Sequence, residues 1–292
     1  MWVACHITSV VQYLRPFLSE LYAALYSGTE NFVWRKQIQH SINWIEVFVY
    51  DENQSPSRSY KVSTYLGEGS SVEINMDASP WGLGAYIAVN GVIIEFFKSA
   101  ISEEEARILG MEIGSPSSQQ AAEALVALVA SRLWKSHWLD EGTTLRVKSD
   151  SVAALILVVK LKTSGSACGI IAREVALELS RCPWPPLTAV HIPGLANGIC
   201  DNLSRVASPS PCHSLPPALQ MATEVTPPRR DMSYFRTLKS PTSGQGGRSE
   251  PSEYGNKRSR RIDTSINAAT TGTSVVDIPA LRHERYNFRP SH

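Results

Sequence analysis

The sequence predicts an α/β fold in which helices flank a mixed five-stranded sheet, followed by a disordered C-terminal tail. Three β-prone segments follow one another from residue 71, and Asn90–Gly91 between the second and the third is a hairpin signal. Strand and helix patterns then alternate up to residue 207, which is typical of βα units. Beyond that point the periodic patterns stop and Ser, Thr, Pro, Gly and Arg dominate.

Residues 1–70 contain helical patterns but are too few to form a core of their own. Leucines recur at helical spacing from Leu14 to Leu25, and Pro16 begins or kinks this helix. A second apolar-rich stretch, INWIEVFVY, covers residues 42–50. Because so short a region buries little apolar area, we expect it to belong to a larger unit.

Each element of residues 71–207 is predicted from its own pattern. Pro183 stops the third helix, and β-branched residues leave a strand possible for the second. The expected strands are SVEINMDAS, LGAYIAVN, GVIIEFFKSA, TTLRVKSD and LTAVHIPG, and the expected helices are SQQAAEALVALVASRLWKSHWL, SVAALILVVKLK, CGIIAREVALELSRC and ICDNLSRVA.

The predicted tail, residues 208–292, also differs from the predicted core in charge. Residues 71–207 hold 11 Lys and Arg against 14 Asp and Glu, a net charge of −3, whereas the tail holds 12 against 7, a net charge of +5. A basic cluster lies at Lys257, Arg258, Arg260 and Arg261. This cluster predicts contact with nucleic acid or a nuclear localisation signal. The alternative is a solvated basic linker.

Composition also bears on the compartment. The sequence has no run of 18 apolar residues, and its N-terminus lacks the basic start and small-residue cleavage site of a secretory signal. Its five cysteines form no CxxC pair, so we expect free thiols and no zinc site. We therefore expect an intracellular protein, cytoplasmic or nuclear, without membrane contact or a small-molecule cofactor.

Four carboxylates stand out by their positions. Asp77 and Asp150 end strands, Asp201 opens the last helix, and Glu123 lies among small apolar residues of a long helix, where a lone carboxylate is costly. Carboxylates gathered at one point repel each other, and hard divalent cations such as Mg²⁺ relieve that repulsion. Each residue also has a structural alternative, as a turn former (Asp77), a helix N-cap (Asp150 and Asp201) or part of a polar helix face (Glu123).

Four segments carry a resemblance to a known family. MDASPWGLGAYI, AAEALVAL, VKSDSVAAL and HIPGLANGICDNLSR resemble the ribonuclease H domain of retroelement reverse transcriptases, particularly gypsy-like and DIRS-like elements. The resemblance covers residues 71–207, and residues 1–70 resemble the segment that links a polymerase thumb to this domain. The most specific motif, HxPGxxNxxxDxLSR, is matched by His191, Pro193, Gly194, Asn197, Asp201, Leu203, Ser204 and Arg205.

The resemblance implies a ribonuclease H-like fold and hydrolysis of the RNA strand of RNA–DNA hybrids. It implies the hybrid as a partner, together with the polymerase portion of the same polyprotein, and Mg²⁺ as cofactor, with Mn²⁺ suited to the same oxygen ligands. His191 has either a structural or a chemical role. The implied metal ligands are Asp77, Glu123, Asp150 and Asp201, and the implied nucleic-acid contacts are Ser79, Ser151, Asn197 and Arg205.

Small residues follow Asp77, and the resemblance gives them a role as well. Ala78, Ser79, Gly82 and Gly84 are expected to leave room for the backbone of the hybrid. The alternative for the two glycines is that they serve the turn alone.

The sequence departs from the family pattern in several places. It contains no YxDD-like polymerase motif, which predicts a fragment, a decayed copy or a misassigned reading frame, and few basic residues lie between Asp150 and Asp201. Glu112 is an alternative to Glu123, because the segment before it aligns poorly. The competing functions are an inactive ribonuclease H-fold relic that binds nucleic acid or acts as a spacer, and an integrase or resolvase, which the HIPG…CDNLSR ending disfavours.

Overall fold

The structure is a computed structural model. It describes residues 11–26, 32–50, 62–66, 68–138, 143–181, 187–210, 215–239 and 241.

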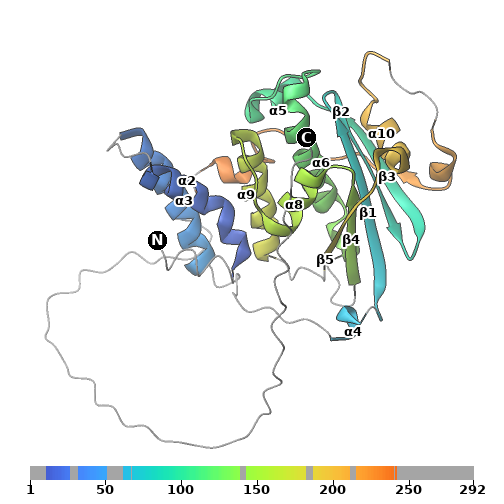
Figure 1. Ribbon diagram of the computed structural model, residues 1–292, viewed down its shortest axis with the longest axis horizontal. Helices are drawn as coiled ribbons and strands as arrows, with labels where there is room; N and C mark the ends of the chain where they lie inside the picture. The colour runs from blue at the N-terminus through green and yellow to red at the C-terminus, as the bar shows by residue number, and fades with distance from the viewer. Residues whose placement is uncertain are drawn as a thin grey trace, which may run out of the picture. The chain divides into compact units, whose positions relative to one another are not determined.

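The described residues form one mixed sheet with the strand order β5-β4-β1-β2-β3-β6 (Figure 1). The first three strands in sequence are antiparallel neighbours, whereas β4 runs parallel to β1 and β5 runs parallel to β4. These directions confirm the predicted ribonuclease H-like sheet, to which β6 adds a short parallel strand that was not predicted. The strands are β1 (Ser70–Ser79), β2 (Gly82–Val89), β3 (Val92–Ala100), β4 (Thr143–Ser149), β5 (Leu187–His191) and β6 (Thr223–Glu224).

The predicted hairpin between β2 and β3 is confirmed. Asn90 and Gly91 both have positive φ, 51° and 82°, as a two-residue hairpin turn requires. The Asn90 side chain also accepts a hydrogen bond from the Ser71 backbone, at 3.0 Å, and so ties the turn to β1.

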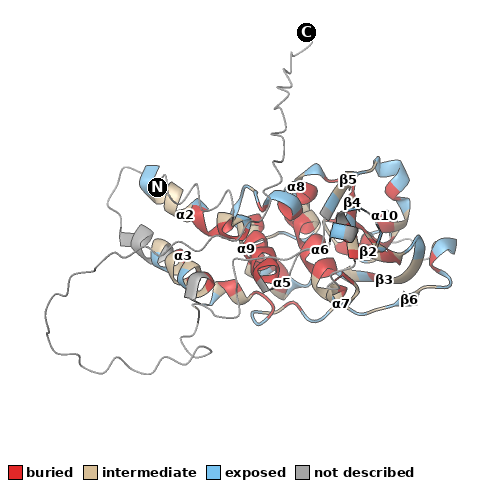
Figure 2. Ribbon diagram, turned by 90° about the horizontal axis from the view of Figure 1, so that it is seen from below, coloured by how far each residue is buried: buried red, intermediate tan, exposed pale blue. Residues whose placement is uncertain are grey.

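Helices cover both faces of the sheet. On one face, α6 contacts β1 and packs against α8 and α9, and Figure 2 shows that α6 and α9 are largely buried. The much shorter α10 contacts β1 and β2 on the other face. The helices of this part are α5 (Glu103–Leu109), α6 (Gln119–Leu133), α7 (Lys135–Trp138), α8 (Val152–Lys160), α9 (Ser166–Arg181) and α10 (Gly198–Ser204), with 3-10 turns η2 (Pro116–Ser118) and η3 (Gly194–Asn197).

Side chains alternate along β1 between the apolar core on one face of the sheet and α10 on the other face. Ile74, Met76 and Ala78 are buried in the main apolar core with α6. Asp77 and Ser79 point to the opposite face, where both bond to Ser204 of α10. The segment SVAALILVVKLK, for which a strand was also possible, forms helix α8.

The N-terminal helices share this main core. Helix α2 (Arg15–Tyr26) follows the 3-10 turn η1 (Gln12–Leu14), and α3 (Phe32–Tyr50) comes next, with a short α4 (Val62–Tyr65) before β1. Phe17 and Phe48 meet with their ring centroids 5.2 Å apart, and both belong to the core cluster of the sheet. The interpretation of residues 1–70 as a polymerase thumb or connection remnant stays a prediction.

The prediction of disorder from residue 208 onwards is wrong for residues 215–239. This segment, which we call the C-terminal strap, contains η4 (Pro217–Leu219), β6 and η5 (Arg236–Leu238). Its Leu219, Phe235 and Thr237 are completely buried, so the strap belongs to the folded unit. Residues 242–292, with the predicted basic cluster Lys257–Arg261, lie outside the described residues.

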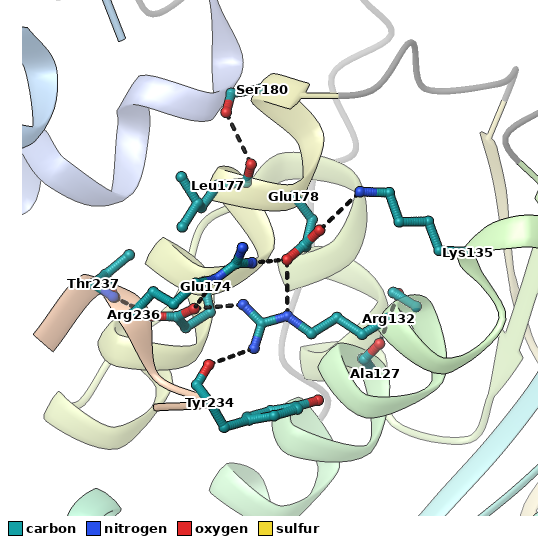
Figure 3. Close-up of polar contacts among 11 residues, drawn as sticks. Ala127, Arg132, Lys135, Glu174, Leu177, Glu178, Ser180, Tyr234, Arg236 and Thr237 are labelled. Atoms are coloured by element: carbon teal, nitrogen blue, oxygen red, sulfur yellow. Dashed lines mark hydrogen bonds and ion pairs between the residues drawn. The ribbon is translucent and has the colours of Figure 1, made fainter. Parts of the chain in front are cut away.

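Two buried glutamates of α9 fasten the strap through charged hydrogen bonds (Figure 3). Glu174 accepts from the Thr237 backbone at 2.5 Å and from Arg132 of α6 at 2.5 Å. Glu178 accepts from Arg132 at 2.9 Å, from Lys135 at 3.1 Å and from Arg236 of the strap. The predicted tail thus supplies groups that satisfy carboxylates buried under it.

A second group of hydrogen bonds, made by Arg230, joins the strap to α5. The neighbouring Arg229 provides a control for testing its effect. Arg230 is buried and bonds to the fully buried Glu105, to Ser99 at 2.9 Å and to the Ala100 carbonyl at 2.9 Å. We expect Arg230→Ala to lower the free energy of unfolding of the full chain by about 3–5 kcal/mol, because it leaves Glu105 as an unpaired buried charge. Urea denaturation monitored by tryptophan fluorescence measures this loss.

Arg229 provides the matched control for Arg230. Its side chain is 78% exposed and pairs with Glu104 at the surface, so Arg229→Ala is expected to change stability far less. Equal unfolding midpoints for the two variants would contradict a fastening role for the strap.

Two further sequence predictions concern the membrane and the cysteines. Among the described residues, no helix has the length and apolar character needed to cross a membrane. Cys168 and Cys200 are free thiols, as predicted, and both are buried. Cys5, Cys182 and Cys212 lie outside the described residues.

Candidate active site

The predicted carboxylates line one cavity of about 350 Å³. They come from four elements: Asp77 from β1, Glu123 from α6, Asp150 from the end of β4 and Asp201 from α10. Glu112, the alternative to Glu123, is exposed and is not among the residues that line this cavity.

Strand direction explains why Asp77 and Asp150 line the same cavity. Strands β1 and β4 are parallel, so their carboxyl ends lie at the same edge of the sheet. Asn75 is level with Lys148 in this pairing, and two residues further along the chain Asp77 and Asp150 follow. Helix α10 brings Asp201 to this edge by packing across β1 and β2.

Two glycines allow α10 to approach the sheet. A Cβ atom at Gly84 would lie 2.5 Å from the Leu203 Cβ and 2.5 Å from the Ser204 nitrogen, and one at Gly82 would lie 2.7 Å from the Ser204 carbonyl oxygen. The expectation that these glycines make room for the hybrid, or serve only the turn, is therefore wrong. Their missing side chains are what lets α10 place Asp201 beside Asp77.

The electrostatics of Asp77 indicate uncompensated negative charge. Burial is the largest cause that raises the pKa of Asp77 to about 7, and the charges of Asp150 and Asp201 raise it further. A hydrogen bond from the Ser204 hydroxyl to Asp77 Oδ2, at 2.8 Å, acts in the opposite direction. A nearby cation would favour the ionised form of this carboxyl group.

Glu123 is not the isolated buried carboxylate that its sequence neighbours suggest. It is partly exposed, and it accepts hydrogen bonds from Gln119 at 3.0 Å and from the Ser151 hydroxyl at 2.5 Å. Gln119 also donates to the Ala78 carbonyl at 2.7 Å, which holds the start of α6 against the end of β1. Sequence reasoning gave Gln119 no role, although its position one helical turn before Glu123 is a usable signal.

Neither Asp150 nor Asp201 is a helix N-cap, so that alternative is wrong for both. Ser151 caps α8 by accepting from the Ala154 nitrogen at 3.2 Å, and the N-cap position of α10 is Asn197. Asp201 lies within the first turn of α10.

Asp150 is held by two residues of the HxPGxxN part of the motif. Asn197 is buried and donates both to Asp150 Oδ1, at 3.3 Å, and to the Met76 carbonyl, at 3.1 Å. The exposed His191 is 3.1 Å from the Asp150 carbonyl oxygen through its Nε2 atom. This contact suits the structural alternative for His191, whose role stays a prediction.

The residues predicted to contact nucleic acid differ in how accessible they are. Ser79 and Asn197 are buried, and the Ser79 hydroxyl donates to the Ser204 carbonyl at 2.7 Å. Ser151 is buried as well, whereas Arg205 is half exposed and pairs with Asp201 at 2.8 Å. Their contacts with nucleic acid stay predictions, and Arg205 is the member best placed for one.

The donor set fits a hard divalent cation in its chemistry. All four groups are carboxylates, which Mg²⁺ and Mn²⁺ accept as ligands, and the pKa of Asp77 is raised first by burial and then by the charges of Asp150 and Asp201. In the part of the chain that the structure describes, however, no group of three or more His, Cys, Asp or Glu side chains is close enough to hold a metal ion. A cation would therefore have to draw these carboxylates together.

Comparison with known proteins identifies a similar solved structure. The chain is similar to the solved structure of LC11-RNase H1, isolated from compost by a metagenomic approach, at 17% identity and a TM-score of 0.35. The match covers 48% of this chain and 94% of that one. No protein-family model and no curated protein matches the chain.

Proposed function

We propose that this protein is a metal-dependent endonuclease that hydrolyses the RNA strand of RNA–DNA hybrids. The observation that carries the proposal is the cavity lined by Asp77, Glu123, Asp150 and Asp201, each from a different element. The match of HIPGLANGICDNLSR to the closing motif of retroelement ribonuclease H domains supports it. The same resemblance supports an origin in a reverse transcriptase polyprotein, whose polymerase portion would be a partner.

In this function the four carboxylates would hold Mg²⁺, or Mn²⁺ in its place. Divalent cations at such a site activate a water molecule for attack on the phosphodiester and stabilise the leaving oxygen. The protein's own contribution is orientation. Asn197 fixes Asp150, Gln119 and Ser151 fix Glu123, and the half-exposed Arg205 offers a guanidinium group to a phosphate at the rim of the cavity.

A second function is favoured by a separate observation. The carboxylates do not close on one point, and residues 71–207 carry a net charge of −3, from 11 basic against 14 acidic residues. The open carboxylate set suits an inactive ribonuclease H-fold module, and the net negative charge suits one that acts as a spacer better than one that binds nucleic acid.

A cleavage assay with the purified full chain distinguishes the two functions. The substrates are a labelled RNA strand paired with DNA, the same RNA alone, and a DNA duplex of the same sequence. We expect cutting of the RNA in the hybrid with Mg²⁺ or Mn²⁺, none with EDTA, and little on the other substrates. The assay is run at low salt, because phosphate contacts weaken as salt rises.

The Asp77→Asn variant, purified in parallel, excludes a contaminating nuclease. A hybrid that is bound in a gel-shift assay but stays uncut with either metal would support the inactive module. Cutting that persists unchanged in the Asp77→Asn variant would overturn the site assignment.

A further inference from the structure

We propose that Ser204 is a positioning residue that sets the carboxylate of Asp77 against that of Asp201 for metal binding. This role rests on the proposed function. No role was assigned to Ser204 from its place in the closing motif.

The geometry places Ser204 at the junction of the two residues. Its hydroxyl donates to Asp77 Oδ2 at 2.8 Å, and the carbonyl oxygen of Asp201 lies 3.0 Å from the same hydroxyl. A hydroxyl has one proton, and in the ionised form that a cation would bind, the Asp77 carboxylate is a stronger acceptor than the neutral Asp201 carbonyl. The bond therefore fixes Oδ2 of Asp77 from the side of α10.

The backbone of Ser204 is held as firmly as its side chain. Its carbonyl accepts from the Ser79 hydroxyl at 2.7 Å, and its nitrogen and oxygen face Gly84 and Gly82 of β2. Ser204 is completely buried, so its hydroxyl cannot exchange Asp77 for water. One residue thus links β1, β2 and α10, the elements that present two of the four carboxylates.

Outer hydrogen-bond partners of metal ligands typically change metal affinity by about 10- to 100-fold when they are removed. We therefore expect Ser204→Ala to weaken Mn²⁺ binding by at least about tenfold in calorimetric titration of the full chain. The Mg²⁺ concentration needed for half-maximal cleavage is expected to rise in parallel. Ser204→Cys keeps a weak hydrogen-bond donor of similar size. Its Mn²⁺ affinity is expected to lie between those of the parent chain and Ser204→Ala.

Ser180→Ala is the matched control. Ser180 is also buried, and its hydroxyl also lies close to a carbonyl three residues earlier, that of Leu177, to which it donates at 2.9 Å (Figure 3). It does not line the cavity of the carboxylates. We expect this variant to bind Mn²⁺ like the parent chain. In an Asp77→Asn background, Ser204→Ala is expected to have no further effect on binding.

The results of these titrations and assays distinguish a failure of the role proposed for Ser204 from a failure of the proposed function on which it rests. A parent chain that neither binds Mn²⁺ nor cuts the hybrid would overturn the proposed function, and the inference with it. A parent chain that does both, with unchanged Mn²⁺ affinity in folded Ser204→Ala or Ser204→Cys, would overturn the inference alone. Equal weakening in Ser180→Ala would reduce Ser204 to a general packing residue.

Discussion

Asp77→Asn is expected to abolish hybrid cleavage while making the metal-free protein more stable at neutral pH. The loss of activity, on the order of 1,000-fold, follows from the proposed function, in which Asp77 is one of the four metal ligands. The fold is expected to persist, because the Asn oxygen can still accept the hydrogen bond from Ser204. Loss of function and gain of stability then come from the same change.

The direction of the stability change follows from the pKa of Asp77. Its folded-state pKa is about 7, above the ordinary value of 3.8, mainly because the group is buried. The protonated form is therefore favoured in the folded state. The stability that the protonated carboxyl group of Asp77 contributes is fully present below about pH 4 and is lost as the pH rises towards 7. The difference between these two pKa values corresponds to about 4 kcal/mol in the free energy of unfolding between pH 4 and pH 7.

Urea denaturation in EDTA between pH 4 and pH 8 tests this prediction. The stability of Asp77→Asn relative to the parent chain is expected to grow with pH across that window and to level off above pH 7. A constant difference between the two proteins would show that Asp77 ionises normally. Added Mg²⁺ should narrow the gap at pH 8, because a cation stabilises only the carboxylate.

Gly84→Ala is expected to destabilise the protein by about 3 kcal/mol and to remove most of its activity. The added Cβ would meet the Ser204 nitrogen and the Leu203 Cβ, both at 2.5 Å, and backbone atoms cannot rotate away. Helix α10 would have to move off β2, and Asp201 would move with it. Thermal unfolding and the hybrid assay on the same preparation measure both effects.

Gly169→Ala is the control for this substitution. Gly169 lies in α9, and a Cβ at this position would meet nothing within 4 Å. Alanine is the better helix former, so this variant is expected to be neutral or more stable by up to about 1 kcal/mol. If Gly84→Ala were as stable as Gly169→Ala, the close approach of α10 to β2 would be contradicted.

The sheet could be predicted from sequence because its signals are local. The Asn90–Gly91 turn fixes the hairpin of β2 and β3, and helix and strand periods mark the elements that follow. The carboxylates at the ends of β1 and β4 could be assigned to one site only through the resemblance of their segments to a known family. The β-branched residues of α8 left both a helix and a strand possible, and tertiary packing decides between the two.

The strap and the supports of the site were missed because their signals are not local. Arg230 and Arg236 stand in a polar, Pro-containing stretch, and the glutamates that they neutralise lie in α5 and α9. Nothing in that stretch itself marks it as buried. Gly84 likewise suggests a turn or an open channel, whereas its function depends on α10, which joins the site from a remote part of the sequence.

The strap also bears on how the chain folds during synthesis. Glu105 leaves the ribosome 125 residues before its partner Arg230, and Glu174 leaves it 63 residues before Thr237. The contact between His40 and the Thr237 carbonyl spans 197 residues. Contacts of such long range form slowly, because the chain between them must first be ordered. We therefore expect the nascent protein to expose its buried glutamates until almost the whole folded unit has been translated, and to complete its folding only then.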